Sequence, residues 1–381
     1  MSKLFSTFKL GGMTLANRIV VAPMCQYSAV DGAATDWHMM HLGQLAISGA
    51  GMMVIEATAV TAEGRITPGD LGIYTGEAEK AIGKVIDAVR SYSPIPIGMQ
   101  LAHAGRKGSC MVPWQGGEQI SVKAPNGWVT YAPSALPFNP VDEPPVALNN
   151  AEMTRIRKAF VKAAQRACRI GVDFIELHSA HGYLLHQFLS PLSNEREDKY
   201  GGSLQNRMRF PLEVFEAVRA AVPEHIPVGI RISATDWVAE GWEIGQSVAY
   251  CKELKRRGCA YIHVSSGGLS PRQEILAGPN YQIGFADRIR KDVKLPVIAV
   301  GLITEPEQAE KIINSNQADM VALARAMLYD PRWPWHAAAK LGAQVTVPPQ
   351  YLRSPPHGVK DLFKKSVFKK TVIKKIGLEK T

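Results

Sequence analysis

Cysteine is scarce in this sequence, and long apolar runs are absent. The five cysteines are scattered, with no CxxC pair and no Cys/His cluster, which argues against a disulfide framework, structural zinc or an iron–sulfur cluster. No stretch approaches the roughly 18 consecutive apolar residues that a membrane span needs. Residues 1–10 contain no apolar core of a secretory signal. We therefore expect a globular protein of a reducing compartment, by default the cytoplasm.

Positive charge is in excess but unevenly spread. The net charge is +10, yet residues 359–381 hold eight lysines against two acids and carry +6, which leaves +4 for residues 1–358. The basic pI therefore describes a tail rather than the body, and we expect no nucleic-acid partner. For residues 363–381, where lysine pairs alternate with apolar residues, two interpretations stay open. One is a solvated disordered tail, and the other is a basic amphipathic helix for an anionic membrane surface or an acidic partner.

Apolar strand-like runs alternate with amphipathic helix-like stretches along the chain. Continuous rather than alternating hydrophobicity is typical of strands buried on both faces, and the alternation predicts a parallel sheet covered by helices. Eight such units favour a closed (β/α)8 TIM barrel, an α/β fold that fits this length as one domain. The predicted strands are Arg18–Ala22, Met52–Glu56, Ile95–Leu101, Val172–His178, Pro227–Ile232, Tyr261–Ser265, Val297–Gly301 and Met320–Ala324. The predicted helices include Glu77–Tyr92, Asn150–Ile170, Leu204–Ala221, Ile244–Arg257 and Glu305–Asn314.

Two insertions interrupt this alternation. Residues 109–147 follow the third strand and are dense in Pro and Gly, which predicts a long irregular excursion that acts as a lid or capping hairpin. Residues 4–15 contain Gly11-Gly12 between short apolar runs and predict an N-terminal hairpin that plugs the barrel. We expect one barrel domain over residues 1–358, with residues 359–381 as a basic tail.

Polar residues at the carboxyl ends of the strands, where barrel active sites form, are rich in donors and poor in carboxylates. Metal-dependent barrel hydrolases need several His, Asp or Glu ligands, and here Glu56 and Asp236 are the nearest candidates. Donors from many strands suit instead an electron-rich, anionic, planar ligand. Arg231 and Gln100 can hydrogen-bond the carbonyl edge of such a ring. Gly301 and Arg325, after strands seven and eight, suit a phosphate.

Several motifs resemble the Old Yellow Enzyme family, in its thermophilic-like and xenobiotic reductase subclass. The similarity extends from Leu4 to Pro356. It is carried by Asn17–Tyr27, Glu56–Val60, Gln100–Arg106 and, most specifically, His178–Pro191, followed by Asn194, Arg196, Asp198 and Tyr200–Ser203. The resemblance implies an FMN-dependent ene-reductase that takes reducing equivalents from NADPH or NADH. Its implied substrates are small electrophiles, either α,β-unsaturated carbonyls or nitro-compounds.

The resemblance also implies roles for individual residues. Pro23, Cys25, Ala57, Gln100 and Arg231 would contact the flavin ring, and Gly301, Ala324 and Arg325 would hold its phosphate. His178 and His181 would bind the activating oxygen of the substrate, Tyr183 would donate a proton, and Tyr27 would line the pocket. Arg353 would reach a neighbouring subunit in a homodimer or homotetramer. No residue is assigned to a metal.

Some positions remain open. The family usually has Gly-Arg where this chain has Ala324-Arg325, so the phosphate geometry depends on the backbone angles of Ala324. Glu56 is either a base or a structural partner, and His103, Arg106 and Lys107 border either the phosphate or the insertion. The alternative function is a metal-dependent TIM-barrel hydrolase.

Overall fold

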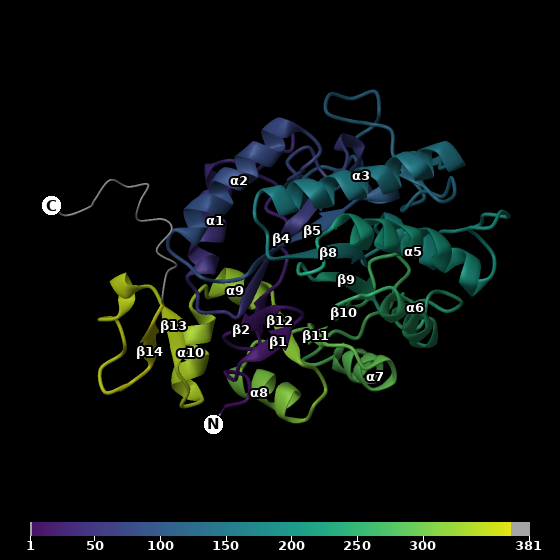
Figure 1. The fold of residues 1–381 in the computed structure, drawn as a ribbon. Helices are drawn as coiled ribbons and strands as arrows, with labels where there is room; N and C mark the ends of the chain where they lie inside the picture. Colours follow the sequence, from purple (N-terminus) through teal and green to yellow (C-terminus); the bar gives the residue numbers. More distant parts are fainter. Residues whose placement is uncertain (1, 367–381) are drawn as a thin grey trace.

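The computed structural model describes residues 2–366, in which eight parallel strands form a closed barrel (Figure 1). Neighbouring strands follow chain order, and the eighth pairs with the first to close the cylinder. The barrel strands are β3 (Ile19–Val21), β4 (Met52–Ala59), β5 (Ile97–Ala102), β8 (Phe174–Ser179), β9 (Val228–Ser233), β10 (Ile262–Ser265), β11 (Val297–Ala299) and β12 (Met320–Leu323). The predicted (β/α)8 barrel is confirmed.

Every residue of these eight strands is buried, which explains their continuous hydrophobicity. Helices cover the outside of the barrel, and the long ones turn an apolar stripe inward. In α3 that stripe includes Met153, Ile156 and Phe160, and the helix begins with a capping box between Asn149 and Glu152. The helices are α1 (Asp36–Ala46), α2 (Gly76–Arg90), α3 (Asn150–Arg169), α4 (Leu184–Leu189), α5 (Leu204–Ala221), α6 (Ile244–Arg256), α7 (Ile283–Val293), α8 (Pro306–Asn314), α9 (Arg325–Tyr329) and α10 (Trp333–Lys340). The 3-10 turns are η1 (Ala62–Gly64), η2 (Gly105–Lys107), η3 (Pro113–Gln115) and η4 (Pro349–Tyr351).

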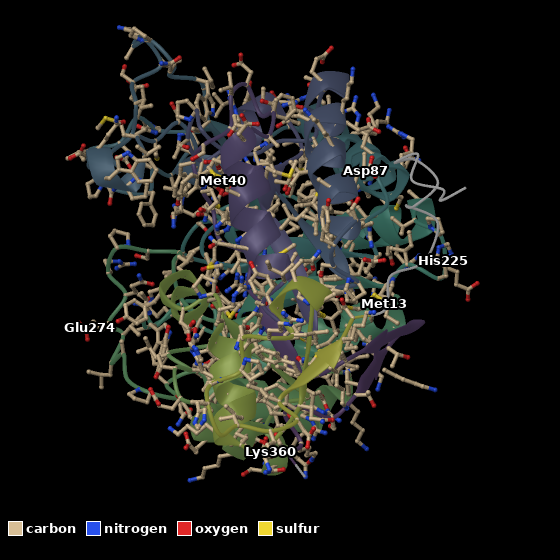
Figure 2. The ribbon with its side chains drawn as sticks, turned by 90° about the vertical axis from the view of Figure 1, so that its left-hand side faces the viewer. Met13, Met40, Asp87, His225, Glu274 and Lys360 are labelled. Carbon is tan, nitrogen blue, oxygen red and sulfur yellow. The ribbon has the colours of Figure 1, made fainter. Side chains whose placement is uncertain are left out.

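The N-terminal hairpin closes the amino end of the barrel, as predicted. Strands β1 (Phe8–Leu10) and β2 (Met13–Leu15) pair antiparallel, and Gly11 at their turn has a φ of +57°. Leu10 and Leu15 are fully buried among barrel residues that include Met52. Figure 2 shows Met13 on the opposite side of the molecule from Glu274, in the loop after β10. The hairpin is therefore far from the carboxyl ends of the strands.

The sequence predicts a lid or a capping hairpin for the insertion after β5. Its strands β6 (Tyr131–Ala132) and β7 (Val146–Ala147) pair in parallel, so they do not form a hairpin, and the lid stays a prediction. Antiparallel pairing there is limited to one bridge between Cys110 and Gln119. Arg196 anchors the insertion by donating to the carbonyls of Pro133 and Leu148. The proline-rich sequence removes backbone donors and so disfavours a regular hairpin.

The folded part extends beyond the predicted boundary at residue 358. Strand β14 (Phe363–Lys365) pairs with β13 (Val345–Val347), and Phe363 packs against Trp335 of α10. The predicted tail therefore begins with an ordered strand. The two interpretations of the lysine-paired segment otherwise concern residues 367–381, which lie outside the described residues. Over residues 2–366, no helix has the length and apolarity required to cross a bilayer.

Candidate active site

Strand register places polar side chains side by side inside the barrel. Gln100 of β5 is paired with Glu176 of β8, while Arg231 of β9 is paired with His178 on one side and His263 on the other. Residues paired in this way on parallel strands share one face of the sheet. A polar layer thus lies across the barrel beneath the strand ends, and its members come from four consecutive strands.

Glu176 is the centre of this layer. It is fully buried and accepts a hydrogen bond of 2.7 Å from Nε2 of Gln100, while its other oxygen lies 3.0 Å from Nδ1 of His263 and 3.3 Å from the Tyr261 hydroxyl. Burial opposes its ionisation, but His263, Arg231 and Gln100 together hold the pKa of Glu176 below its ordinary value. One N–H of the Gln100 amide is engaged with this carboxylate, so its amide oxygen and its second N–H are the groups available to a ligand.

Arg231 is a buried cation with an unused donor. Its side chain is only 7% exposed, and its Nε has no hydrogen-bond partner among the described residues. Burial lowers the pKa of Arg231, and the negative charge of nearby Glu176 partly offsets this shift. Buried guanidinium groups normally have all their N–H groups paired, so an unpaired one indicates that an acceptor binds here.

His178 of this layer forms a cluster with His181 and Tyr183, which follow β8. The ring centroids of His178 and His181 are 5.2 Å apart, and those of His178 and Tyr183 are 4.9 Å apart. Burial, followed by the charge of Arg231, holds the pKa of both histidines well below the ordinary value, so both are neutral. Nδ1 of His178 accepts the backbone N–H of Ala180 at 3.3 Å, which leaves Nε2 as its donor. His181 differs, because its Nε2 already lies 2.7 Å from the Ser265 hydroxyl.

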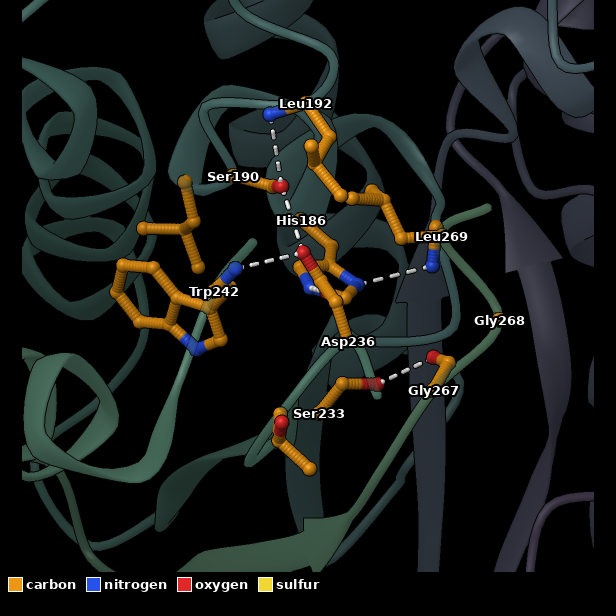
Figure 3. Close-up of polar contacts among 12 residues, drawn as sticks. His186, Ser190, Leu192, Ser233, Asp236, Trp242, Gly267, Gly268 and Leu269 are labelled. Carbon is orange, nitrogen blue, oxygen red and sulfur yellow. Dashed lines mark hydrogen bonds and ion pairs between the residues drawn. The ribbon is translucent and has the colours of Figure 1, made fainter. Parts of the chain in front are cut away.

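The backbone that carries these groups is held in an unusual conformation. His181 and Gly182 both have left-handed φ values, +58° and +74°. The N–H of His181 donates to Ser233 Oγ, which donates in turn to the Gly267 carbonyl (Figure 3). The backbones approach so closely that a Cβ on Gly182 would lie 2.2 Å from the Gly268 oxygen. The turn after β8 is therefore fitted against the loop after β10.

A buried His–Asp pair supports the same turn. Nδ1 of His186 accepts the N–H of Gly182 at 3.0 Å, and its Nε2 lies 2.9 Å from Asp236 Oδ1, at an angle that falls short of a hydrogen bond. The other oxygen of Asp236 accepts from Ser190 Oγ at 2.6 Å and from the Trp242 N–H at 2.8 Å (Figure 3). Since His186 must accept at Nδ1, it is neutral and carries its proton on Nε2.

The loop after β3 brings Cys25 and Tyr27 toward the cluster. Glu56 is buried, and its carboxylate accepts the N–H of Gln26 at 2.9 Å, so its contacts are those of a structural partner. Burial, then Asp70 and Glu56, raises the pKa of Cys25 well above its ordinary value, so it is a thiol. Tyr27 has a φ of +52°, and its ring meets that of Trp114 in the insertion edge-on at 5.8 Å.

A bulge in β4 aligns a further predicted residue. The register shift between Ile55 and Ala57 places Ala57 opposite Gln100 of β5. Pro23 lies two residues after the end of β3. A hydrogen bond from the backbone of Ala57 lowers the pKa of Cys25 and so offsets part of the effect of burial. These predicted ring contacts therefore occupy one side of the barrel mouth, with Arg231 two strands beyond Gln100.

The predicted phosphate residues follow β11 and β12, which are neighbours. Gly301 has a φ of +130°, and a Cβ there would lie 2.8 Å from the side chain of Gln282. Ala324 precedes α9 with a φ of −107°, outside the left-handed region, so its φ does not require the glycine that the family usually has there. Arg325 is exposed. Arg353 is also exposed and follows η4, so no contact of the described chain ties it to the barrel mouth.

Comparisons with known proteins identify the family. Residues 3–344 match the sequence profile of the NADH:flavin oxidoreductase / NADH oxidase family. An NADPH dehydrogenase of Geobacillus thermodenitrificans is 42% identical over 352 residues, which cover 92% of this chain and 98% of that protein. An NADH:flavin oxidoreductase of Gibberella zeae is 40% identical, covering 90% of this chain and 87% of its own. The chain belongs to the NADH:flavin oxidoreductase / NADH oxidase family.

Solved structures agree with this assignment. Morphinone reductase in complex with tetrahydroNAD superposes with a TM-score of 0.73 at 30% identity, over 95% of this chain and 97% of that one. The resemblance to the Old Yellow Enzyme family is confirmed. The protein is an NAD(P)H-dependent flavin oxidoreductase whose cofactor is FMN. The hydrolase alternative receives no support from these relatives. Over residues 2–366, no three His, Cys, Asp or Glu side chains are grouped as metal ligands would be.

The residues present fit FMN. The unpaired Nε of Arg231 and the free amide oxygen of Gln100 supply a donor and an acceptor for the ring, as the pyrimidine edge of a flavin requires. Sequence reasoning missed Glu176 and His263, although both share the inward face with residues it had named. Alternate residues of a strand share one face, and Glu176 lies two residues before His178 in β8. This spacing indicates that Glu176 also points into the barrel. His186 stood inside the quoted motif but received no role.

Proposed function

We propose that this flavin oxidoreductase is an ene-reductase for activated C=C bonds of α,β-unsaturated carbonyls, and that it also accepts nitro-compounds. The observation that carries this proposal is the neutral pair His178 and His181, adjacent to Arg231, whose Nε has no hydrogen-bond partner among the described residues. Reduced FMN, when bound, would supply the hydride chemistry at the β-carbon. The protein must then stabilise the negative charge that develops on the substrate oxygen, which donors in a water-poor site do well.

His178 and His181 bind that oxygen. His178 offers its Nε2–H directly, while His181 either exchanges its contact with Ser265 for the substrate or polarises it through the serine. Tyr183 delivers the proton to the α-carbon. Burial raises the pKa of its hydroxyl well above the ordinary value, so it keeps that proton until a carbanion-like centre draws it.

The other predicted contacts complete the site. Pro23, Cys25, Ala57, Gln100 and Arg231 would hold the flavin ring, and Arg231 would stabilise the negative charge that reduction brings. Tyr27 would line the substrate pocket beside Trp114. The phosphate would be held by residues that follow β11 and β12, namely Gly301, Ala324 and Arg325.

The test is reduction of cyclohexenone by the flavin-bound protein with NADPH. Steady NADPH oxidation with formation of cyclohexanone is expected. The double variant His178→Ala/His181→Ala should keep its flavin yet lose at least about a hundredfold in kcat/KM, since removing one donor of this kind typically costs that much. Undiminished turnover in the double variant would remove both histidines from the mechanism.

The cellular setting is also a proposal. We place the enzyme in the cytoplasm, because all five cysteines are free thiols. We propose a homodimer or homotetramer in which Arg353, exposed on its own subunit, enters the neighbour's pocket. Light scattering of the purified protein together with an Arg353→Ala variant tests this, and a monomer with full activity would contradict it. A small electrophile, rather than nucleic acid or a membrane, is the proposed partner.

A further inference from the structure

A cavity of about 270 Å³ lies between the barrel mouth and the insertion. Tyr27 lines it on the barrel side, Phe138 and Asp142 line it on the insertion side, and Arg106 and Lys107 of η2 lie between them. The Nζ of Lys107 is 5.2 Å from the centre of the Tyr183 ring. The cavity therefore adjoins the residues assigned to the substrate, through Tyr27 and Lys107 in its lining.

Lys107 is a cation without an acid partner. Its Nζ donates to the carbonyls of His181 at 3.0 Å and Gly268 at 2.9 Å, and it faces the rings of Phe138 and Tyr183. None of the ion pairs of residues 2–366 includes it. An ammonium group has three N–H donors, so one remains beyond the two carbonyl bonds. Burial lowers the pKa of Lys107 to about 8, which leaves it mostly charged at neutral pH.

Arg106 is a second such cation. It is 5% exposed and donates to the carbonyls of Leu136, Pro137 and Leu269, while its buried Nε has no hydrogen-bond partner in the described chain. No acidic group of residues 2–366 lies within ion-pair distance of it. Burial lowers its pKa to about 10. The structure thus keeps two positive charges at one cavity with only neutral oxygens as direct partners.

The acid on the cavity wall does not neutralise them. Asp142 uses one oxygen to accept both the backbone N–H and the side-chain amide of Asn139, at 2.9 and 3.0 Å. Two cations and one internally bonded carboxylate leave the lining with a net positive charge. Burying charge without a counter-charge is costly, and such sites commonly bind an ion of opposite sign.

We infer that this cavity is an anion subsite, which binds a carboxylate or phosphate group of the molecule whose reactive part lies at His178 and His181. This inference rests on the proposed function for the position of the reactive part. The shared chemistry is a group with oxygens of full negative charge, which accepts charge-assisted hydrogen bonds from Lys107 and Arg106. Two sources supply such a group, namely a carboxylate on the electrophilic substrate and the phosphates of the reduced nicotinamide nucleotide.

Calorimetric titration of the flavin-bound protein with two matched probes tests the subsite. 4-Hydroxybenzoate carries a carboxylate, and 4-hydroxybenzamide has the same shape without the charge. Lys107→Met should weaken benzoate binding about tenfold more than benzamide binding, because a hydrogen bond to a charged group contributes more than a neutral one. Lys107→Arg should retain the preference. Lys123→Met, which removes an exposed lysine of the insertion, should change neither affinity.

A second experiment, on the rate of flavin reduction, identifies which molecule carries the anion. Flavin reduction by NADPH is compared in rapid mixing with reduction by 1-benzyl-1,4-dihydronicotinamide, which has no phosphate. If Lys107→Met slows NADPH about tenfold more than the phosphate-free donor, the cavity binds phosphate. If only the benzoate preference falls, it binds a substrate carboxylate.

Lys107 also holds the turn after β8, so a purely structural role must be distinguishable. In that case Lys107→Met would weaken benzoate and benzamide equally and slow both donors equally, which would overturn the inference. Loss of cyclohexenone reduction with retained charge discrimination in binding would refute the proposed function while leaving the subsite intact.

Discussion

Replacing Asp236 by Asn should reveal how the turn that carries His181 is held. The variant keeps the size of the side chain and removes its charge. The Trp242 N–H requires an oxygen at the Oδ2 position, so the new amide nitrogen must take the Oδ1 position, 2.9 Å from Nε2 of His186. Two N–H groups then face each other. If the His186 proton moves to Nδ1, it meets the N–H of Gly182 instead, at 3.0 Å.

In either tautomer two buried N–H donors face each other, whereas in the native protein Nε2 of His186 lies 2.9 Å from a carboxylate oxygen. An unsatisfied buried donor costs about 1–3 kcal/mol, and breaking a buried pair by changing one partner costs about 3–5 kcal/mol. We expect a loss of about 3 kcal/mol, because Asp236 and His186 are both fully buried and no solvent can replace the lost contact. Ser190→Ala is the matched control. It removes one neutral donor from the same carboxylate and should cost about 1 kcal/mol.

Chemical denaturation of the flavin-bound protein measures both losses, and calorimetric titration with 4-hydroxybenzamide measures the effect on the turn. Asp236→Asn should weaken binding about tenfold more than Ser190→Ala, since only the former disturbs the acceptor of Gly182. If Asp236→Asn is as stable as Ser190→Ala and binds the probe equally well, His186 does not need the Asp236 carboxylate to hold its tautomer.

Three further changes test other contacts. Glu176→Gln should lower stability by about 3–5 kcal/mol in denaturant titrations, because the new amide would face a donor within the layer; wild-type stability would show that Glu176 is not ionised. Gly268→Ala, whose Cβ would lie 2.7 Å from His181 Cα, should reduce probe binding with flavin retained, whereas Gly278→Ala has nothing within 4 Å and should bind normally. Because folded Lys107 has a pKa of about 8 against an ordinary 10.5, the unfolded chain binds more protons between these values. The melting temperature relative to Lys107→Met should therefore rise across that pH window, and a flat difference would contradict burial of the charge.

The barrel could be predicted from the sequence because its strands are buried on both faces. Continuous apolar runs such as Phe174–Leu177, separated by amphipathic stretches, leave few other folds open. The predicted fold also located the active site, since the active-site residues of a (β/α)8 barrel lie at the carboxyl ends of its strands. The insertion was less predictable. Its parallel β6–β7 pairing depends on tertiary anchors such as Arg196, and no local pattern of Pro and Gly specifies that topology.

Positions at strand ends were also easier to predict than the residues that orient them. His178 follows from its motif, whereas the importance of Glu176 depends on its register with Gln100, and strand register is set by the whole barrel. The bulge at Glu56 is a similar case. It shifts the register of β4 by one residue, which aligns Ala57 with Gln100, and a sequence read as uniform strands gives no sign of it.

The contacts of Arg106 and Lys107 link three separate loops, and we expect these contacts to affect which anions the cavity binds. Arg106 joins the insertion at Leu136 to the loop after β10 at Leu269, and Lys107 joins that loop to the turn at His181. The polar layer below is built wholly from barrel strands, so changes in the insertion leave it intact. Substitutions in the insertion should therefore alter which anions bind while the redox site persists, since Lys107 faces Phe138 of the insertion and donates to the His181 carbonyl of the turn after β8.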